Sequence, residues 1–197
     1  GAWCQYCPGG HASMEELLSV RNDVVPICIQ DDGGYGAQYD KLMIPEGDAV
    51  AVKLADGFPS IMFDRQFFYD RQTVNFSPFV SWFNQDVDWK VPSDQRLNWA
   101  VPANVSLLNL EYDTAARQLE VDVKADFFNV VSGDLRLNLM LTEDSVIGNG
   151  LGYDQANSFS GNANFSSSPF YSEADPIANY PHRHVLRKSL DGAWGTA

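Results

Sequence analysis

Alternating hydrophobic and polar residues dominate the second half of the chain. In residues 119–127 every second side chain is apolar and its neighbours are charged, and residues 135–141 repeat the alternation with leucines. A period of two places the apolar side chains on one face, which is typical of half-buried antiparallel strands. The pattern predicts a β-sandwich domain over residues 103–197. The side chains expected in its interior are Leu119, Val121, Val123, Leu135, Leu137 and Leu139.

The first half of the chain mixes helical and strand-like patterns. Some stretches repeat their apolar residues at helical spacing, whereas others are short, continuous apolar runs. Residues 91–102 contain two prolines and are expected to link this part to the β domain. We therefore expect an α+β protein with a first domain over residues 1–98. The elements predicted in it are helices over 8–22, about 47–55 and 77–90, and strands over 24–30 and 57–64.

Residues 145–181 follow neither pattern. They are rich in Gly, Asn and Ser, with aromatic residues at irregular intervals. A segment this long without a periodic pattern is functional or disordered in most compact domains. Its aromatic rings could form a binding surface, but we favour the interpretation that they pin the segment to the rest of the fold.

Charge excludes two classes of partner. The chain of 197 residues has a formal net charge of −13, and the acidic residues occur in both halves. A nucleic-acid-binding surface would need a basic patch, and so would attraction to an anionic membrane. No stretch reaches the roughly 18 apolar residues of a membrane-spanning helix. We expect no nucleic-acid partner, no transmembrane segment and no cofactor.

Two cysteines, Cys4 and Cys7, lie three positions apart where the first helix is expected to begin. The start of a helix points unpaired N–H groups and the positive end of its dipole toward the first sulfur. Both effects favour the thiolate, which is the reactive form of cysteine. This is the arrangement that a dithiol–disulfide exchange centre needs. The third cysteine, Cys28, lies in an apolar run and is expected to be buried and unpaired.

The cysteine pair has other interpretations. A c-type haem site would need His after the second cysteine, where the chain has Pro8. A zinc site would need two further ligands, and His182 and His184 would have to reach the cysteines from the other end of the chain. We therefore expect no metal. A structural disulfide without turnover remains an open alternative.

The motif and its surroundings resemble the thioredoxin fold. Trp-Cys-x-x-Cys at a helix start is followed by a predicted strand, a helix and then a Gly-Phe-Pro run that opens another strand. By this resemblance Cys4 is the nucleophile and Cys7 the resolving thiol. The resemblance also implies that Trp3 flanks the sulfurs, and that Phe58 and a cis Pro59 lie beside them where a substrate would bind.

The chain as a whole is similar to the outer-membrane-protein-28-related family. The similarity rests on the Gly-Phe-Pro-Ser run at 57–60 and on residues 180–187 and 192–196. It implies a Gram-negative envelope protein, secreted across the inner membrane and either outer-membrane-associated, for example as a lipoprotein, or periplasmic. Family members continue past the end of this chain, so the β domain is expected to be incomplete at its C-terminus.

Two functions follow from the resemblance. The first is thiol–disulfide exchange, with protein or peptide thiols and disulfides as partners. The second is non-catalytic, adhesin-like binding to other envelope proteins or to a host surface ligand, with a structural disulfide.

Overall fold

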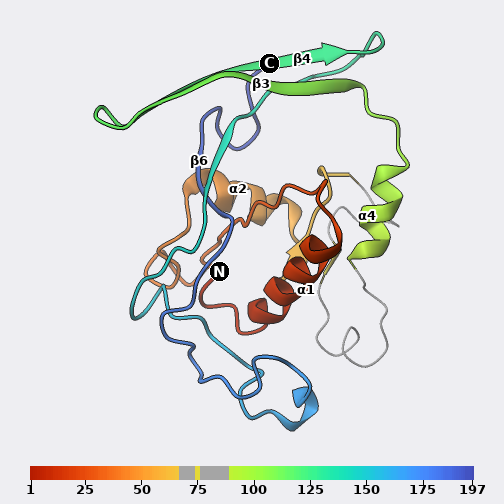
Figure 1. Ribbon diagram of the computed structural model, residues 1–197. Helices are drawn as coiled ribbons and strands as arrows, with labels where there is room; N and C mark the ends of the chain where they lie inside the picture. The colour runs from red at the N-terminus through yellow and green to blue at the C-terminus, as the bar shows by residue number, and fades with distance from the viewer. Residues whose placement is uncertain (67–73, 76–88) are drawn as a thin grey trace. The chain divides into compact units, whose positions relative to one another are not determined.

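The computed structural model describes residues 1–66, 74–75 and 89–197, which form a mixed α+β fold (Figure 1). The helix predicted over 77–90 lies, up to residue 88, outside the described residues. Strands among the described residues form antiparallel pairs, so neither a thioredoxin sheet nor a sandwich is confirmed. The elements are α1 (Cys7–Val20), α2 (Pro45–Leu54), β1 (Ser60–Ile61), β2 (Val74–Asn75), α4 (Lys90–Leu97), β3 (Ala103–Asp113), β4 (Gln118–Phe127), β5 (Met140–Glu143), the short 3₁₀ helix η1 (Ala163–Phe165) and β6 (Val185–Ser189).

The chain divides into two compact units. The first combines Gly1–Asp94 with Arg136–Ala197, and the second is Gln95–Leu135. These units do not coincide with the ranges 1–98 and 103–197 expected from the sequence, because residues 136–197 belong to the same unit as residues 1–94.

Proline opens each of the three α-helices that the structure describes. Pro8 lies in the first turn of α1, Pro45 begins α2, and Pro92 lies in the first turn of α4. The first N–H groups of a helix have no partner within it, so proline loses nothing there. The helix predicted over 8–22 is confirmed, whereas part of the expected linker at 91–102 is helical.

Aromatic side chains from distant stretches build the core of the first unit. Phe159 and Phe165 belong to residues 145–181, called the aromatic segment below. They are 0% and 1% exposed, and their ring centroids lie 5.1 Å apart. Tyr6, just before α1, contacts both rings edge-on. The interpretation that these rings pin the segment to the fold is confirmed for these two phenylalanines. The buried cluster comprises Leu17, Ile61, Phe63, Trp89, Phe159 and Phe165.

The buried strand predicted over residues 24–30 is wrong. The segment makes a single parallel bridge, between Cys28 and Val185 of β6, and Val25 is 86% exposed. The Cys28 N–H donates to the His184 carbonyl at 2.7 Å, and the Leu186 N–H donates to the Cys28 carbonyl at 2.9 Å. The apolar run is therefore held at Cys28, with Val25 and Ile27 exposed and the other side chains half-buried.

The second unit is built around the long hairpin of β3 and β4. Its register pairs Ala103 with Phe127 and Leu107 with Val123, with an irregularity after Leu108. At the turn, the Asp113 carboxylate accepts the N–H groups of the two following alanines, at 2.8 and 2.9 Å. Pairing partners lie on the same face of a sheet, so the alternation predicted over 119–127 is confirmed as one apolar face.

That apolar face is only partly covered. Val121 and Val123 are half-buried, but Leu119 is 48% exposed. The interior positions predicted for Leu135 and Leu137 are also wrong, since both side chains are more than 40% exposed. An alternating sequence selects the face of a strand, but burial of that face requires a second layer.

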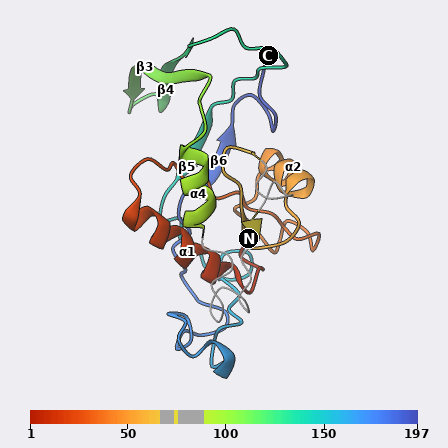
Figure 2. The same ribbon diagram turned by 90° about the vertical axis from the view of Figure 1, so that its right-hand side faces the viewer.

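β5 and β6 form the sheet of the first unit's C-terminal part, and they lie side by side in Figure 2. Met140 pairs with Ser189 and Glu143 with Val185. Of the alternating stretch over 135–141, β5 includes only Met140 and Leu141, and Leu137 makes an isolated bridge with Thr196. Residues 180–184, just before β6, matter for the sites below because Tyr180, Arg183 and His184 contact residues of α1.

Candidate functional site

Cys4 and Cys7 form a disulfide at the start of α1, the red helix in Figure 1, of which Cys7 is the first residue. Their Cα atoms lie 5.3 Å apart. The Cys7 N–H donates to the Cys4 carbonyl at 3.0 Å, and the Gly9 N–H donates to the Tyr6 carbonyl at 3.1 Å. These two turns bring the sulfurs together at the positive end of the helix dipole. The expected position of the pair at a helix start is confirmed.

The segment at 155–158 covers the cysteine motif. The Gln155 side-chain amide donates to the Cys4 carbonyl at 2.9 Å, and the Ser158 N–H donates to the Gln5 carbonyl at 2.9 Å. Ala156 donates its N–H to the Ala2 carbonyl at 2.8 Å. As a result Cys4 is only 4% exposed, whereas Cys7 is half-buried. In this oxidised form Cys4 is therefore enclosed, and Cys7 is the more exposed of the two.

The ring of Trp3, the residue before Cys4, contacts the ring of Phe58. Their ring centroids lie 5.7 Å apart in an edge-on arrangement, and Trp3 makes a similar contact with Tyr35 at 5.4 Å. That Phe58 lies beside the sulfurs stays a prediction. The Trp3 indole N–H donates to the Asp31 carbonyl, which fixes the ring. Trp3 is therefore an anchored side chain that joins the cysteine motif to the loop after Asp31.

Pro59 packs against the first turns of α1. The Phe58–Pro59 peptide is cis, as expected. A Cβ placed on Gly10 would lie 2.6 Å from Pro59 Cβ, so the glycine permits this close approach. The predicted contact between Pro59 and the Cys4 sulfur stays a prediction.

Substituting Gly10 tests the packing of Pro59 on the helix. We expect Gly10→Ala to destabilise the protein by about 1–2 kcal/mol, because overpacking outweighs the gain of roughly 1 kcal/mol in helix propensity. The measurement is the free energy of unfolding in urea. Gly57→Ala is the matched control: its Cβ would meet nothing within 4 Å. The control should be neutral or slightly stabilised. Equal effects of both substitutions would contradict the close approach.

Cys28 is the free cysteine, as expected, but it is half-buried. Burial raises the pKa of its thiol to about 11. The thiol is therefore protonated at neutral pH and is a poor nucleophile. Because Cys4 and Cys7 are joined to each other, the zinc site considered with His182 and His184 is not formed.

Sequence reasoning missed a cluster around His11. The His11 ring contacts Tyr180 edge-on, and Tyr180 in turn contacts His182. Burial lowers the pKa of both His11 and His182. The alternation of His182 and His184 was the available signal, but their rings take different partners: His182 Nε2 lies 2.7 Å from the Tyr153 carbonyl, whereas His184 approaches Glu15.

An acidic cluster is the other group that could hold a cation among the residues described. Oxygens of Asp31, Asp32 and Asp48 lie within 4.8 Å of one another. Asp31 and Asp32 already accept N–H groups of Gly33 and Gly34. The pKa of Asp48 is raised by burial and by a hydrogen bond with Asp31.

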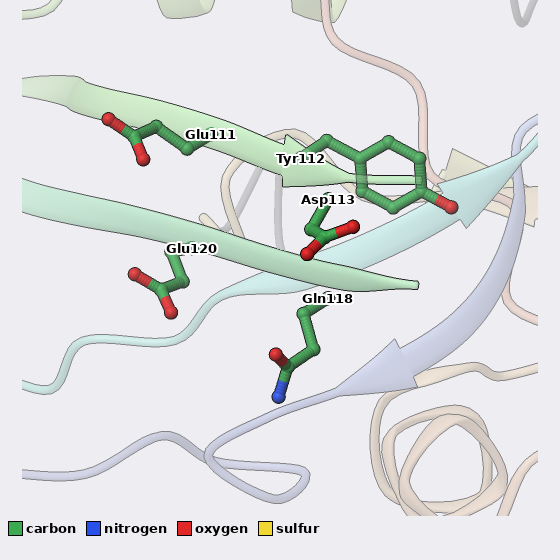
Figure 3. Close-up of a pocket in the computed structure, with 5 residues that line it drawn as sticks. All are labelled: Glu111, Tyr112, Asp113, Gln118 and Glu120. Carbon is green, nitrogen blue, oxygen red and sulfur yellow. The ribbon is translucent and has the colours of Figure 1, made fainter. Parts of the chain in front are cut away.

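A pocket of about 320 Å³ lies at the turn end of the β3–β4 hairpin (Figure 3). Three of the five lining side chains are acidic, and Glu111 and Glu120 are direct register partners. Like charges opposite one another on a sheet repel. The residues that line this pocket are Glu111, Tyr112, Asp113, Gln118 and Glu120.

Size and hydropathy bear on membrane insertion. Within residues 1–66, 74–75 and 89–197, no helix has both the length and the apolar character needed to cross a bilayer.

Comparisons with protein-family models, curated proteins and solved structures gave no match to this chain.

Proposed function

We propose that the Cys4–Cys7 pair is a thiol–disulfide exchange centre in a protein of the Gram-negative cell envelope. The observation that carries the proposal is a disulfide between cysteines three positions apart at the start of a helix. Trp3, Phe58 and Pro59 beside this end of α1 are the proposed contacts for a substrate. A thioredoxin-like first domain and a β-sandwich second domain belong to the same proposal.

The reduced pair would transfer two electrons to a substrate. One cysteine thiolate attacks a substrate disulfide, forms a mixed disulfide and releases the first substrate thiolate. The second cysteine then attacks the mixed disulfide, releases the second substrate thiolate and closes the Cys4–Cys7 bond. The dipole of α1 stabilises the attacking thiolate. If Cys4 attacks first, residues 155–158 must move aside, because they cover it in the oxidised form.

The test is reduction of insulin disulfides by the full chain with a thiol reductant as electron source. We expect catalysis above the uncatalysed rate, complete loss in Cys4→Ser and in Cys7→Ser, and no change in the control Cys28→Ser. The variant that retains the attacking thiol should accumulate a mixed disulfide, which identifies that thiol by mass spectrometry. A wild-type rate equal to that of reductant alone would reject the proposal.

The burial of Cys4 favours a second candidate. In this alternative the disulfide is structural, and the protein binds other envelope proteins or a host surface ligand without catalysis. Wild-type protein would then show no turnover. For a loop this small, loss of the disulfide would cost about 2 kcal/mol of stability.

A further inference from the structure

Two histidines, His11 of α1 and His184 just before β6, approach the same carboxylate oxygen, Oε1 of Glu15. His11 and Glu15 are four positions apart on α1, so they lie on the same face of the helix. His11 Nε2 is 3.5 Å from Glu15 Oε1. His184 Nε2 lies 3.9 Å from the same oxygen. The side chains of His11 and His184 are 17% and 22% exposed, so the site is enclosed but reachable from solvent.

Both histidines have their other ring nitrogen engaged. His11 Nδ1 is hydrogen-bonded to the Tyr180 hydroxyl. His184 Nδ1 lies 3.4 Å from the Asp144 carboxylate, which also accepts the His184 N–H at 2.8 Å. Histidines that bind metal ions are oriented in this way, with one nitrogen held by an outer carboxylate or hydroxyl and the other directed at the ion.

The two atoms that face each other have no hydrogen-bond partner. His11 Nε2 and Glu15 Oε1 are both buried and unsatisfied. The other Glu15 oxygen accepts from Arg183 at 3.1 Å, which leaves Oε1 free. Unsatisfied buried polar atoms are costly, and a cation between them would satisfy both. Ligand atoms of a tetrahedral zinc ion, with bonds of about 2.0–2.1 Å, are separated by roughly 3.4 Å, close to the observed spacing.

We propose that His11, Glu15 and His184 bind a divalent transition-metal ion, with Zn²⁺ as the best fit. Two imidazoles and a carboxylate are ligands that zinc accepts, and three protein ligands leave a fourth position open. His184 Nε2 lies 3.9 Å from Glu15 Oε1, farther than the roughly 3.4 Å between ligand atoms of tetrahedral zinc, so binding draws the His184 ring inward. The cation of Arg183 beside Glu15 weakens binding relative to a site without it.

The experiment uses the oxidised full chain carrying Cys28→Ser, so that no free thiol competes for the metal. Calorimetric titration with ZnCl₂ should show one ion per chain. His11→Gln and His184→Gln should each weaken zinc binding tenfold or more. Substitution of a residue that only orients a metal ligand already lowers metal affinity by about tenfold or more. The matched control is His182→Gln, because that ring binds the Tyr153 carbonyl instead of facing Glu15. The control should retain the affinity of the parent chain.

A second measurement covers the case in which a variant folds poorly. Saturating zinc should raise the melting temperature of the parent chain and of His182→Gln, because it binds the native state only. The melting temperature of Glu15→Gln, which keeps the side-chain shape, should not respond. Absence of zinc binding by the folded parent chain would overturn the proposal. So would an equal loss of affinity in His182→Gln. Since the cysteines stay oxidised throughout, the outcome does not depend on thiol–disulfide exchange.

Discussion

Phe159→Ala should destabilise the protein by about 3–5 kcal/mol, the usual cost of removing a fully buried phenyl ring. Phe159 is 0% exposed and contacts Tyr6, Phe165 and Phe170 through its ring. Its loss would leave a cavity where the aromatic segment joins α1. The free energy of unfolding in urea measures the effect. A loss of this size approaches the total stability of many domains.

Tyr171→Ala is the control for this experiment. Tyr171 belongs to the same Gly- and Ser-rich segment, but its side chain is 36% exposed. We expect a change within about 1 kcal/mol, as for most surface substitutions. If both variants lost the same small amount of stability, the segment would not be part of the core. The comparison therefore separates a structural role of residues 145–181 from a loosely attached loop.

Cys28 should react with an alkylating reagent about 300-fold more slowly at pH 7 than an ordinary thiol. Its pKa is raised to about 11 by burial, whereas an exposed cysteine titrates near 8.5. A higher pKa means less thiolate at neutral pH, and the thiolate is the species that reacts. The measurement is the alkylation rate of the Cys4→Ser/Cys7→Ser variant, in which Cys28 is the single thiol. The rate should rise about tenfold per pH unit until it levels off near pH 11.

The same variant unfolded in urea supplies the control. In the unfolded chain the thiol is exposed, so its rate should level off near the ordinary pKa. A plateau below pH 9 in the folded protein would contradict the effect of burial. Within the wild-type protein after reduction, Cys7 should then be labelled well before Cys28.

Local patterns in the sequence predicted the elements whose structure depends on near neighbours. The helix over 8–22 is confirmed almost to the residue as α1, because a first-turn proline and apolar residues at helical spacing act within a few positions. The alternation over 119–127 predicted the apolar face of β4 for the same reason. The disulfide between Cys4 and Cys7 closes across two tight turns, and it too is a local event.

Other expectations failed where burial depends on what arrives from far along the chain. The run over 24–30 was predicted to be a buried strand, but it makes one bridge to β6, and its side chains are half-buried or exposed. The hairpin selected its apolar face correctly, yet no second layer covers it fully among the residues described. The hydrophobic pattern of a helix or strand specifies which of its faces prefers burial. It does not specify which other segment of the chain packs over that face.

The sequence by itself determined the cysteine pair and its place at a helix start. Only the tertiary structure decided that Gln155, 151 positions from Cys4, covers the motif and limits access to it. Only the tertiary structure brought His184 to Glu15 on α1. Contacts across such separations are selected by the shape and hydrogen-bonding of whole segments during packing, and no short-range pattern in the chain encodes them.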